Sequence, residues 1–150
     1  MATLRTLADK MRKASVSVER NADKLVKDVA IGVLTSVVRD TPVDTGQAKS
    51  NWQVAMMKPA SGTRAAYVPG EKGSTSLDNT IAAIEMGQAK IENEYISGSE
   101  IHITNNLEYI TDLNDGASSQ APPGYVQEAV LEALGKIQVA GFSILHDIEV

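Results

Sequence analysis

The sequence predicts an α+β fold for a single domain of 150 residues: a long N-terminal helix and a small antiparallel sheet of about three or four strands, packed against two or three further helices. Three observations predict this class. Apolar residues recur every three or four positions over the first forty residues, the spacing of one helix face. Two short segments, near 52–57 and 100–104, alternate apolar and polar residues as strands do. Two later segments, 76–95 and 124–146, return to the helical spacing.

A single helix is predicted from about Thr3 to Asp40, because no proline interrupts the pattern before Pro42. From Ala30 onward the pattern is apolar around more of the circumference, which predicts deeper burial there. Five cations lie on the opposite side of the helical wheel and are expected to point away from the core: Arg12, Lys13, Arg20, Lys24 and Lys27. The apolar stripe itself consists of Leu4, Leu7, Met11, Ala14, Val18, Ala22, Leu25, Val29, Val33 and Val37.

This helix is longer than the domain that should contain it. At 1.5 Å per residue it extends about 55 Å, whereas a compact chain of this size has a radius of gyration near 15 Å. We therefore expect the first half of residues 1–40 to project and to bury its stripe on a neighbour, most simply another copy of the chain. Residues 41–150 would form the α+β body.

The body begins with an alternating segment from Trp52 to Met57, which predicts a strand with Trp52 on its inner face. Residues 58–75 are rich in Gly, Ser and Pro and are expected to form a loop, with a short strand around 65–68. A helix from Ser76 to about Tyr95 follows, where the helical spacing resumes.

The second part of the body is predicted to contain another strand and two helices. Ile101 and Ile103 alternate with polar residues and predict another strand, which the pair Asn105-Asn106 ends in a turn. A short helix is expected before Gly116, and a loop containing two prolines follows it. The last helix is predicted from about Gly124 to His146, with these residues on its buried side: Val126, Val130, Leu134, Ile137, Gly141 and Ile144.

Few residues suggest catalysis or a bound cofactor. The chain contains no cysteine, and neither His102 nor His146 has a further ligand at the spacing of a metal site. No phosphate-binding loop or nucleophile elbow is present. We therefore predict a non-enzyme without cofactor or metal. The first residues do not resemble a signal peptide and no apolar run reaches membrane-spanning length, so a cytoplasmic protein without a membrane is expected.

The segment Thr41-Pro42-Val43-Asp44-Thr45-Gly46 contains the Asp-Thr-Gly triplet of aspartic proteases, and it allows two interpretations. A protease would use Asp44 in a dimer, because two carboxylates must share one proton. A structural turn would have Asp44 cap the next turn, with Gln47 completing a capping-box-like pair and Gly46 relaxing the backbone. A helix and Pro42 precede the triplet, where retroviral-type proteases have a buried strand, so the structural turn is favoured.

Basic and acidic residues are distributed unevenly along the chain. Residues 1–58 carry ten Lys or Arg against six Asp or Glu, whereas residues 59–150 carry four against thirteen. Three interpretations remain open: nucleic-acid binding by the basic face of the N-terminal helix, complementary surfaces that pair between copies, or solvated faces without a partner.

Short motifs recur in an ordered series over about Thr41 to Ala133. After residues 41–46 come Ser50-Asn51-Trp52 and Ile103-Thr104-Asn105-Asn106-Leu107 with Tyr109. These are followed by Leu113, Gly116, Ser118, Gln120-Ala121-Pro122 and Gly124-Tyr125-Val126. In this order and spacing the series resembles the neck or tail-completion proteins of tailed bacteriophages. The chain departs from the family pattern at Glu108, where proline is common.

The resemblance implies a structural virion protein at the head–tail junction, assembled in the host cytoplasm, in a neck, tail-completion or tail-terminator role. It implies a homo-oligomeric ring, with a hexamer favoured over a dodecamer, in contact with neighbouring neck, connector or tail-tube proteins. DNA would pass through the lumen without specific binding. The motif residues would form structural turns: Thr41, Pro42, Asp44, Thr45, Gly46, Asn105, Asn106, Gly116, Pro122 and Gly124.

We also predict the surfaces that would join the subunits of such a ring. The N-terminal helix would contribute its stripe and its basic face, and an acidic surface of the next subunit would receive them. The expected interface residues are Leu4, Leu7, Met11, Arg12, Lys13, Val18, Arg20, Lys24 and Lys27, with Glu92, Glu94, Glu108, Asp112 and Asp115.

Overall fold

The computed structural model describes the backbone of residues 4–146 and the side chains of residues 4–136. Its elements in chain order are α1 (Leu4–Asp40), α2 (Gln47–Ser50), β1 (Gln53–Met56), α3 (Ser76–Glu94), β2 (Ile101–Thr104), α4 (Ile110–Asn114) and α5 (Tyr125–His146). The predicted α+β class and the long N-terminal helix are confirmed.

The sheet is smaller than predicted. Within residues 4–146 it contains two antiparallel strands, β1 and β2, with Val54 opposite Ile103, in place of three or four. The strand expected around residues 65–68 does not form. There the backbone N–H of Val68 donates to Asn79 Oδ1 and its carbonyl accepts from Asn79 Nδ2, so a side chain satisfies the groups that a strand would offer to a neighbour.

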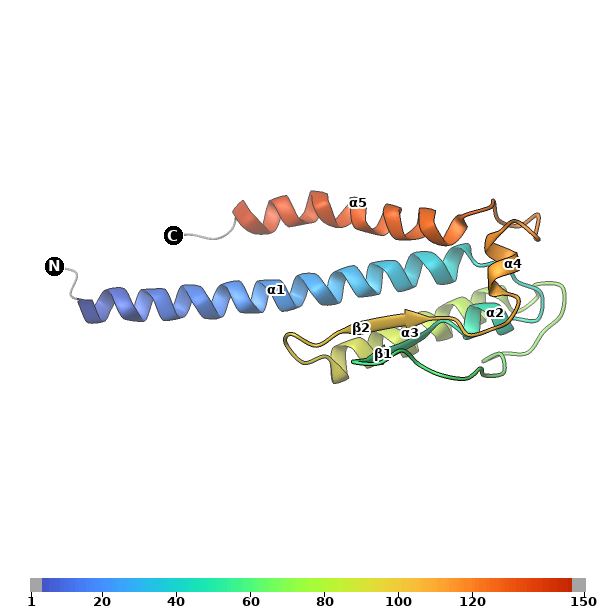
Figure 1. Cartoon of the computed structure of the whole chain (residues 1–150), viewed down its shortest axis with the longest axis horizontal. Coiled ribbons are helices and arrows are strands. Elements are labelled where there is room, and N and C mark those ends of the chain that lie inside the picture. Colours follow the sequence, from blue (N-terminus) through green and yellow to red (C-terminus); the bar gives the residue numbers. More distant parts are fainter. Residues whose placement is uncertain (1–3, 147–150) are drawn as a thin grey trace.

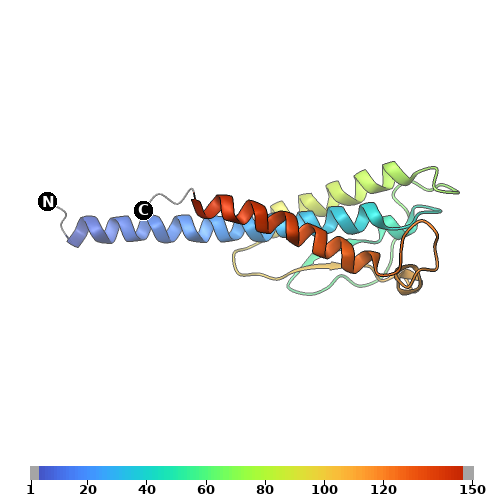
Figure 2. The same ribbon diagram turned by 90° about the horizontal axis from the view of Figure 1, so that it is seen from above.

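The elements lie in layers around α1 (Figure 1). The helix α5 runs antiparallel along one side of α1, while α3 and the two strands lie on the other side. The N-terminal part of α1 extends past every other element, as the view from above also shows (Figure 2). The body therefore encloses only the C-terminal half of this helix.

The core forms around that second half of α1. Leu34 and Val38 are fully buried, which confirms the predicted deeper burial after Ala30. Gly87 of α3 lies so close to Leu34 that a Cβ atom added there would overlap a methyl group of Leu34, so the missing side chain lets the two helices approach. The core cluster comprises Ala30, Leu34, Val37, Val38, Trp52, Val54, Ala83, Ile91 and Ala129.

The orientation predicted for α1 is only partly right within the body: Val37 of the stripe is buried in the core, but so is the side predicted to face away from it. At 3.6 residues per turn, Leu34 and Val38 lie on the same side of the helix as Lys27, opposite the stripe. That side packs against α3, and the Lys27 ammonium lies 5.6 Å from the ring centre of Tyr95. The stripe therefore located only one of the two buried sides of the second half, because its periodicity comes mainly from the first half of α1, which does not enter the core.

The buried side of α5 also differs from the prediction. Tyr125, Ala129 and Ala133 are buried, whereas Val126 and Val130 are half-buried and Leu134 is exposed. Small alanines at the contact allow close packing against α1, which shifts the buried face toward them. The predicted positions Ile137, Gly141 and Ile144 lie outside the described side chains.

The inner face of the sheet agrees with the prediction. Trp52 and Val54 are both buried, and the Trp52 Nε1–H donates to Thr41 Oγ1 at 2.7 Å. Thr41 Oγ1 in turn donates to the Val37 carbonyl at 2.6 Å. These two hydrogen bonds link the chain's one tryptophan to the C-terminal end of α1.

Candidate functional site

The first half of α1 presents an apolar stripe to solvent. Leu4, Leu7, Met11 and Val18 are 87%, 52%, 65% and 55% exposed. All four lie on one side of the helix, at spacings of three, four and seven residues. An exposed row of large aliphatic side chains over several turns is unusual for a free surface and is typical of an interface.

The stripe continues into an apolar groove on the body. The groove has a volume of about 480 Å³ and lies between α1 and β2. Its floor includes the stripe residues Leu25, Val29 and Val33, and Ile101 and Ile103 of β2 form the opposite wall. Among the described residues the groove is lined by Leu25, Val26, Val29, Ala30, Val33, Ile101 and Ile103.

A second hollow extends this groove toward α4. It has a volume of about 350 Å³ and shares Ile103 with the first. Trp52, Thr104, Ile110 and Val126 are among the residues that line it. The Thr104 hydroxyl oxygen is buried there without a hydrogen-bond partner within the described part of the chain. Stripe, groove and hollow therefore form one continuous track along α1 and β2.

The predicted interface cations fall into two groups. Lys24 pairs with Asp28 at 2.5 Å and Lys27 lies over the Tyr95 ring, so both are engaged within their own subunit. Arg12 approaches Asp9 only at 3.9 Å, with both side chains largely exposed, and Lys13 and Arg20 make no ion pair with any described residue. Only these last three offer charge to a partner.

The predicted acidic surface divides into two separate patches. Glu92 and Glu94 lie in the last turn of α3, where Glu92 accepts a hydrogen bond from Gln88 and Glu94 lies 4.0 Å from Lys90. Asp112 lies within α4, and Glu108 and Asp115 flank it, at the opposite end of the body (Figure 1). The structure therefore does not bring these five acids together.

The turn at residues 41–46 forms, but its cap differs from the prediction. Thr45 Oγ1, and not the Asp44 carboxylate, accepts the backbone N–H of Gln47, at 3.4 Å. Asp44 Oδ1 instead accepts the N–H of Lys72 at 2.8 Å, and the Asp44 carbonyl accepts the N–H of Gly73. Asp44 thus anchors the loop before α3, because its carboxylate accepts one backbone N–H of that loop and its carbonyl accepts the next.

Gly46 is required by this turn. Its φ is 89°, and an added Cβ would overlap the side chain of Asn79. Asn79 is fully buried, and its Oδ1 accepts hydrogen bonds from the Ser50 hydroxyl at 2.8 Å and from the Val68 N–H at 3.0 Å. Sequence reasoning did not single out Asn79, although an asparagine in the first turns of a helix is itself a sign of side-chain bonding to a neighbouring loop.

The structure brings the two turn motifs together. Gln120 bridges them: its Oε1 accepts the Val43 N–H at 3.0 Å, and its Nε2 donates to the Val43 carbonyl at 2.9 Å. Near Gln120, Gly116 has a φ of 96° and packs against Pro123. Gly124 donates its N–H to the Asn114 carbonyl, and Pro122 is exposed.

The turn at Asn105 and Asn106 fastens β2 to two other segments. Asn105 Nδ2 donates to the Ala48 carbonyl in α2 at 2.9 Å. Asn106 Nδ2 donates to the carbonyls of Ala60 and Gly62 at 2.9 and 3.1 Å. The predicted turn residues therefore connect neighbouring loops and position the β2 wall of the groove.

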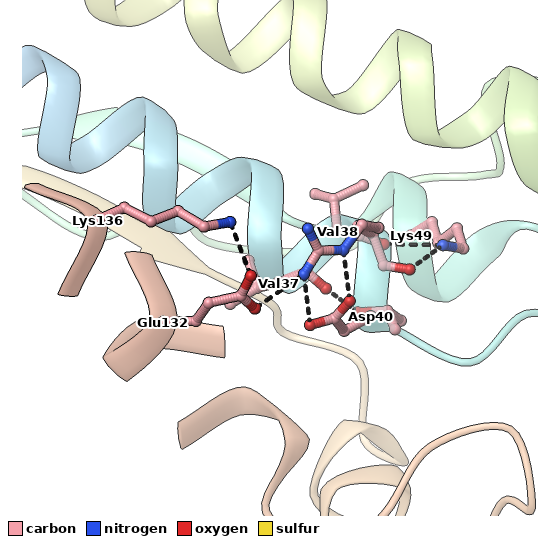
Figure 3. Close-up of polar contacts among 8 residues, drawn as sticks. Val37, Val38, Asp40, Lys49, Glu132 and Lys136 are labelled. Atoms are coloured by element: carbon pink, nitrogen blue, oxygen red, sulfur yellow. Dashed lines mark hydrogen bonds and ion pairs between the residues drawn. The ribbon is translucent and has the colours of Figure 1, made fainter. Parts of the chain in front are cut away.

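A polar cluster closes the C-terminal end of α1 (Figure 3). The buried Lys49 donates from Nζ to the carbonyls of Val38 and Arg39, both at 2.9 Å, and so satisfies groups that the helix end leaves unpaired. Burial lowers the pKa of Lys49 from its usual 10.5. Arg39 joins Asp40 and Glu132, and bonds from Lys136 and Arg39 lower the pKa of Glu132.

The described residues contain no group of three or more His, Cys, Asp or Glu side chains placed to hold a metal ion. No helix in the described part of the chain has both the length and the apolar character to span a membrane. Comparisons with family models, curated proteins and solved structures found no significant match. The stripe and the groove are therefore the features that bear on function.

Proposed function

We propose that the protein is a structural, non-catalytic component of a bacteriophage virion, and that its subunits form a ring at the junction of head and tail. The observation that carries the proposal is the exposed apolar stripe of α1, which a single subunit leaves uncovered. Burying apolar surface gives about 25 cal/mol per Å², so several turns of covered stripe would drive association.

Two further features support this function. Heterologous interfaces, in which one surface of a subunit meets a different surface of the next, generate closed rings when the rotation closes. The chain carries two such different surfaces, the projecting stripe and the apolar groove. The motif series resembles that of neck and tail-completion proteins, and its residues form the joined turns that hold the body together.

Association is tested by mass measurement. The purified protein is expected to form a discrete oligomer by light scattering coupled to gel filtration, with a ring visible by electron microscopy and a hexamer favoured. The double variant Leu7→Asp with Met11→Asp should dissociate to monomers while keeping its helical circular dichroism, because both side chains are exposed in one subunit.

The matched control is Val16→Asp. Val16 has the same exposed fraction as Leu7, 52%, but lies on the opposite side of α1. This variant should therefore stay oligomeric. A wild-type monomer at high concentration, or absence of the protein from purified particles of the phage that encodes it, would refute the proposed function.

A further inference from the structure

We infer that the apolar groove between α1 and β2 is the docking site for the first half of α1 from a second copy of the chain. This inference rests on the proposed function and specifies which surfaces the subunits use. The guest would present Leu4, Leu7, Met11 and Val18, and the host would receive them along Leu25, Val29, Val33, Ile101 and Ile103.

A subunit cannot fill its own groove. The stripe and the groove floor belong to one uninterrupted helix, Leu4–Asp40, and face the same direction. Leu7 and Val26 are nineteen residues apart, which is about 28 Å along the axis. A stripe that fills the groove must therefore come from another molecule, and each copy offers both a stripe and a groove.

Both surfaces are elongated. The stripe from Leu4 to Val18 extends about 21 Å along the helix axis. The groove and the adjoining hollow share Ile103 and together run from Leu25 past the end of β2 to Ile110. A guest helix in this track would pack beside α1 on the inner face of the sheet. It would cover the half-buried side chains of β2.

Charge favours the same pairing. No Lys or Arg occurs between Lys90 and Lys136, so β2, α4 and their connecting loops carry an excess of acids, among them Glu108 and Asp112, while Glu100 lies 3.1 Å from His102. The guest segment carries an excess of cations: Arg5, Lys10, Arg12, Lys13 and Arg20, against Asp9 and Glu19. Opposite charges on the flanks of an apolar contact would fix its register and speed the encounter.

Crosslinking tests the inference cleanly because the chain has no cysteine. The double variant Leu7→Cys with Val26→Cys, treated as the assembled oligomer with a short bismaleimide, should give crosslinks between subunits. Val26 is 39% exposed at the groove and is accessible to the reagent. We expect a yield at least about tenfold above that of the control Val16→Cys with Val26→Cys, because docking raises the local thiol concentration.

The outcomes separate this inference from the proposed function. A ladder extending beyond dimers supports both, since each subunit is joined to the next around a ring. Crosslinked dimers without higher species support the docking but overturn the ring. They indicate a closed two-fold dimer in which each subunit inserts its stripe into the groove of the other. An oligomer that persists without crosslinks above the Val16 control overturns the docking and leaves the ring standing. Monomers at every concentration overturn both.

Discussion

The two halves of α1 share one continuous helix and similar aliphatic side chains, yet they have opposite surroundings. In the second half Leu34 and Val38 are fully buried among α3, α5 and the sheet, while in the first half Leu4 and Leu7 are exposed. The contacts of Tyr95 mark the boundary: its hydroxyl donates to Asp23, and Lys27 lies over its ring. An apolar pattern thus predicts that a face will be covered, but not which molecule covers it.

The largest expected difference between the two halves is in the free energy of unfolding when one leucine of each half is replaced by alanine. Leu34→Ala should lower the free energy of unfolding by about 2–5 kcal/mol, because it leaves a cavity against Gly87 and Val54. Leu7→Ala should change the stability of an isolated subunit by less than about 0.5 kcal/mol. Urea titration of dilute monomer, followed by the fluorescence of Trp52, measures both. Equal losses would mean that the projecting half is packed within its own subunit.

Much of the fold was readable from the sequence because its elements depend on local signals. The helical spacing and Pro42 located α1, and alternation located β1 and β2. The number of strands could not be predicted from the sequence. The backbone of Val68 forms hydrogen bonds with the side chain of Asn79, eleven residues away, and no local pattern predicts this contact. The core face of α1 was predicted only in part, since the burial of Leu34 depends on the close approach of Gly87 in α3.

Of the two surfaces of the candidate site, only the stripe was predictable from the sequence. The stripe belongs to a single helix, so its spacing reveals it. The groove needs Ile101 and Ile103 of β2 beside Val29 of α1, and such a contact between distant segments has no signature in either one. The same limit explains why five acids were grouped in the prediction although Glu92 and Glu108 lie at opposite ends of the body.

An intermediate effect is expected at the buried end of α1. Lys49→Met should lower the free energy of unfolding by about 1–3 kcal/mol, because the carbonyls of Val38 and Arg39 lose their charged donor. Among residues 4–20 of the projecting half no buried charged side chain of this kind is found, so the variant contrasts a helix end that the body holds with one that projects from it. Urea titration at neutral pH measures the loss, and an unchanged stability would show that water replaces the donor at no cost.

The same residue should give the protein a pH dependence that the variant lacks. Burial lowers the folded-state pKa of Lys49 below 10.5, so between the folded and unfolded pKa values the unfolded chain binds more protons. Wild-type stability should therefore rise relative to Lys49→Met as pH increases through the window just below 10.5. The difference between the two proteins removes the contribution of groups that they share. A difference that stays flat over this window would indicate that Lys49 is solvated in the folded state.

The smallest effect concerns charge on the projecting half. Replacing Arg12, Lys13 and Arg20 with Gln should leave subunit stability unchanged but slow assembly by about tenfold at low salt, since exposed charges act mainly on the encounter rate. The deficit should fade near 1 M salt, where the Debye length is about 3 Å. The matched variant Lys24→Gln with Lys27→Gln should assemble at the wild-type rate, because Asp28 and Tyr95 already engage these cations. Stopped-flow light scattering distinguishes them. If the second variant were the slower one, Lys24 and Lys27 would act on the partner, the boundary between the halves would lie nearer the C-terminus than Asp23, and the surface open to a partner would be correspondingly longer.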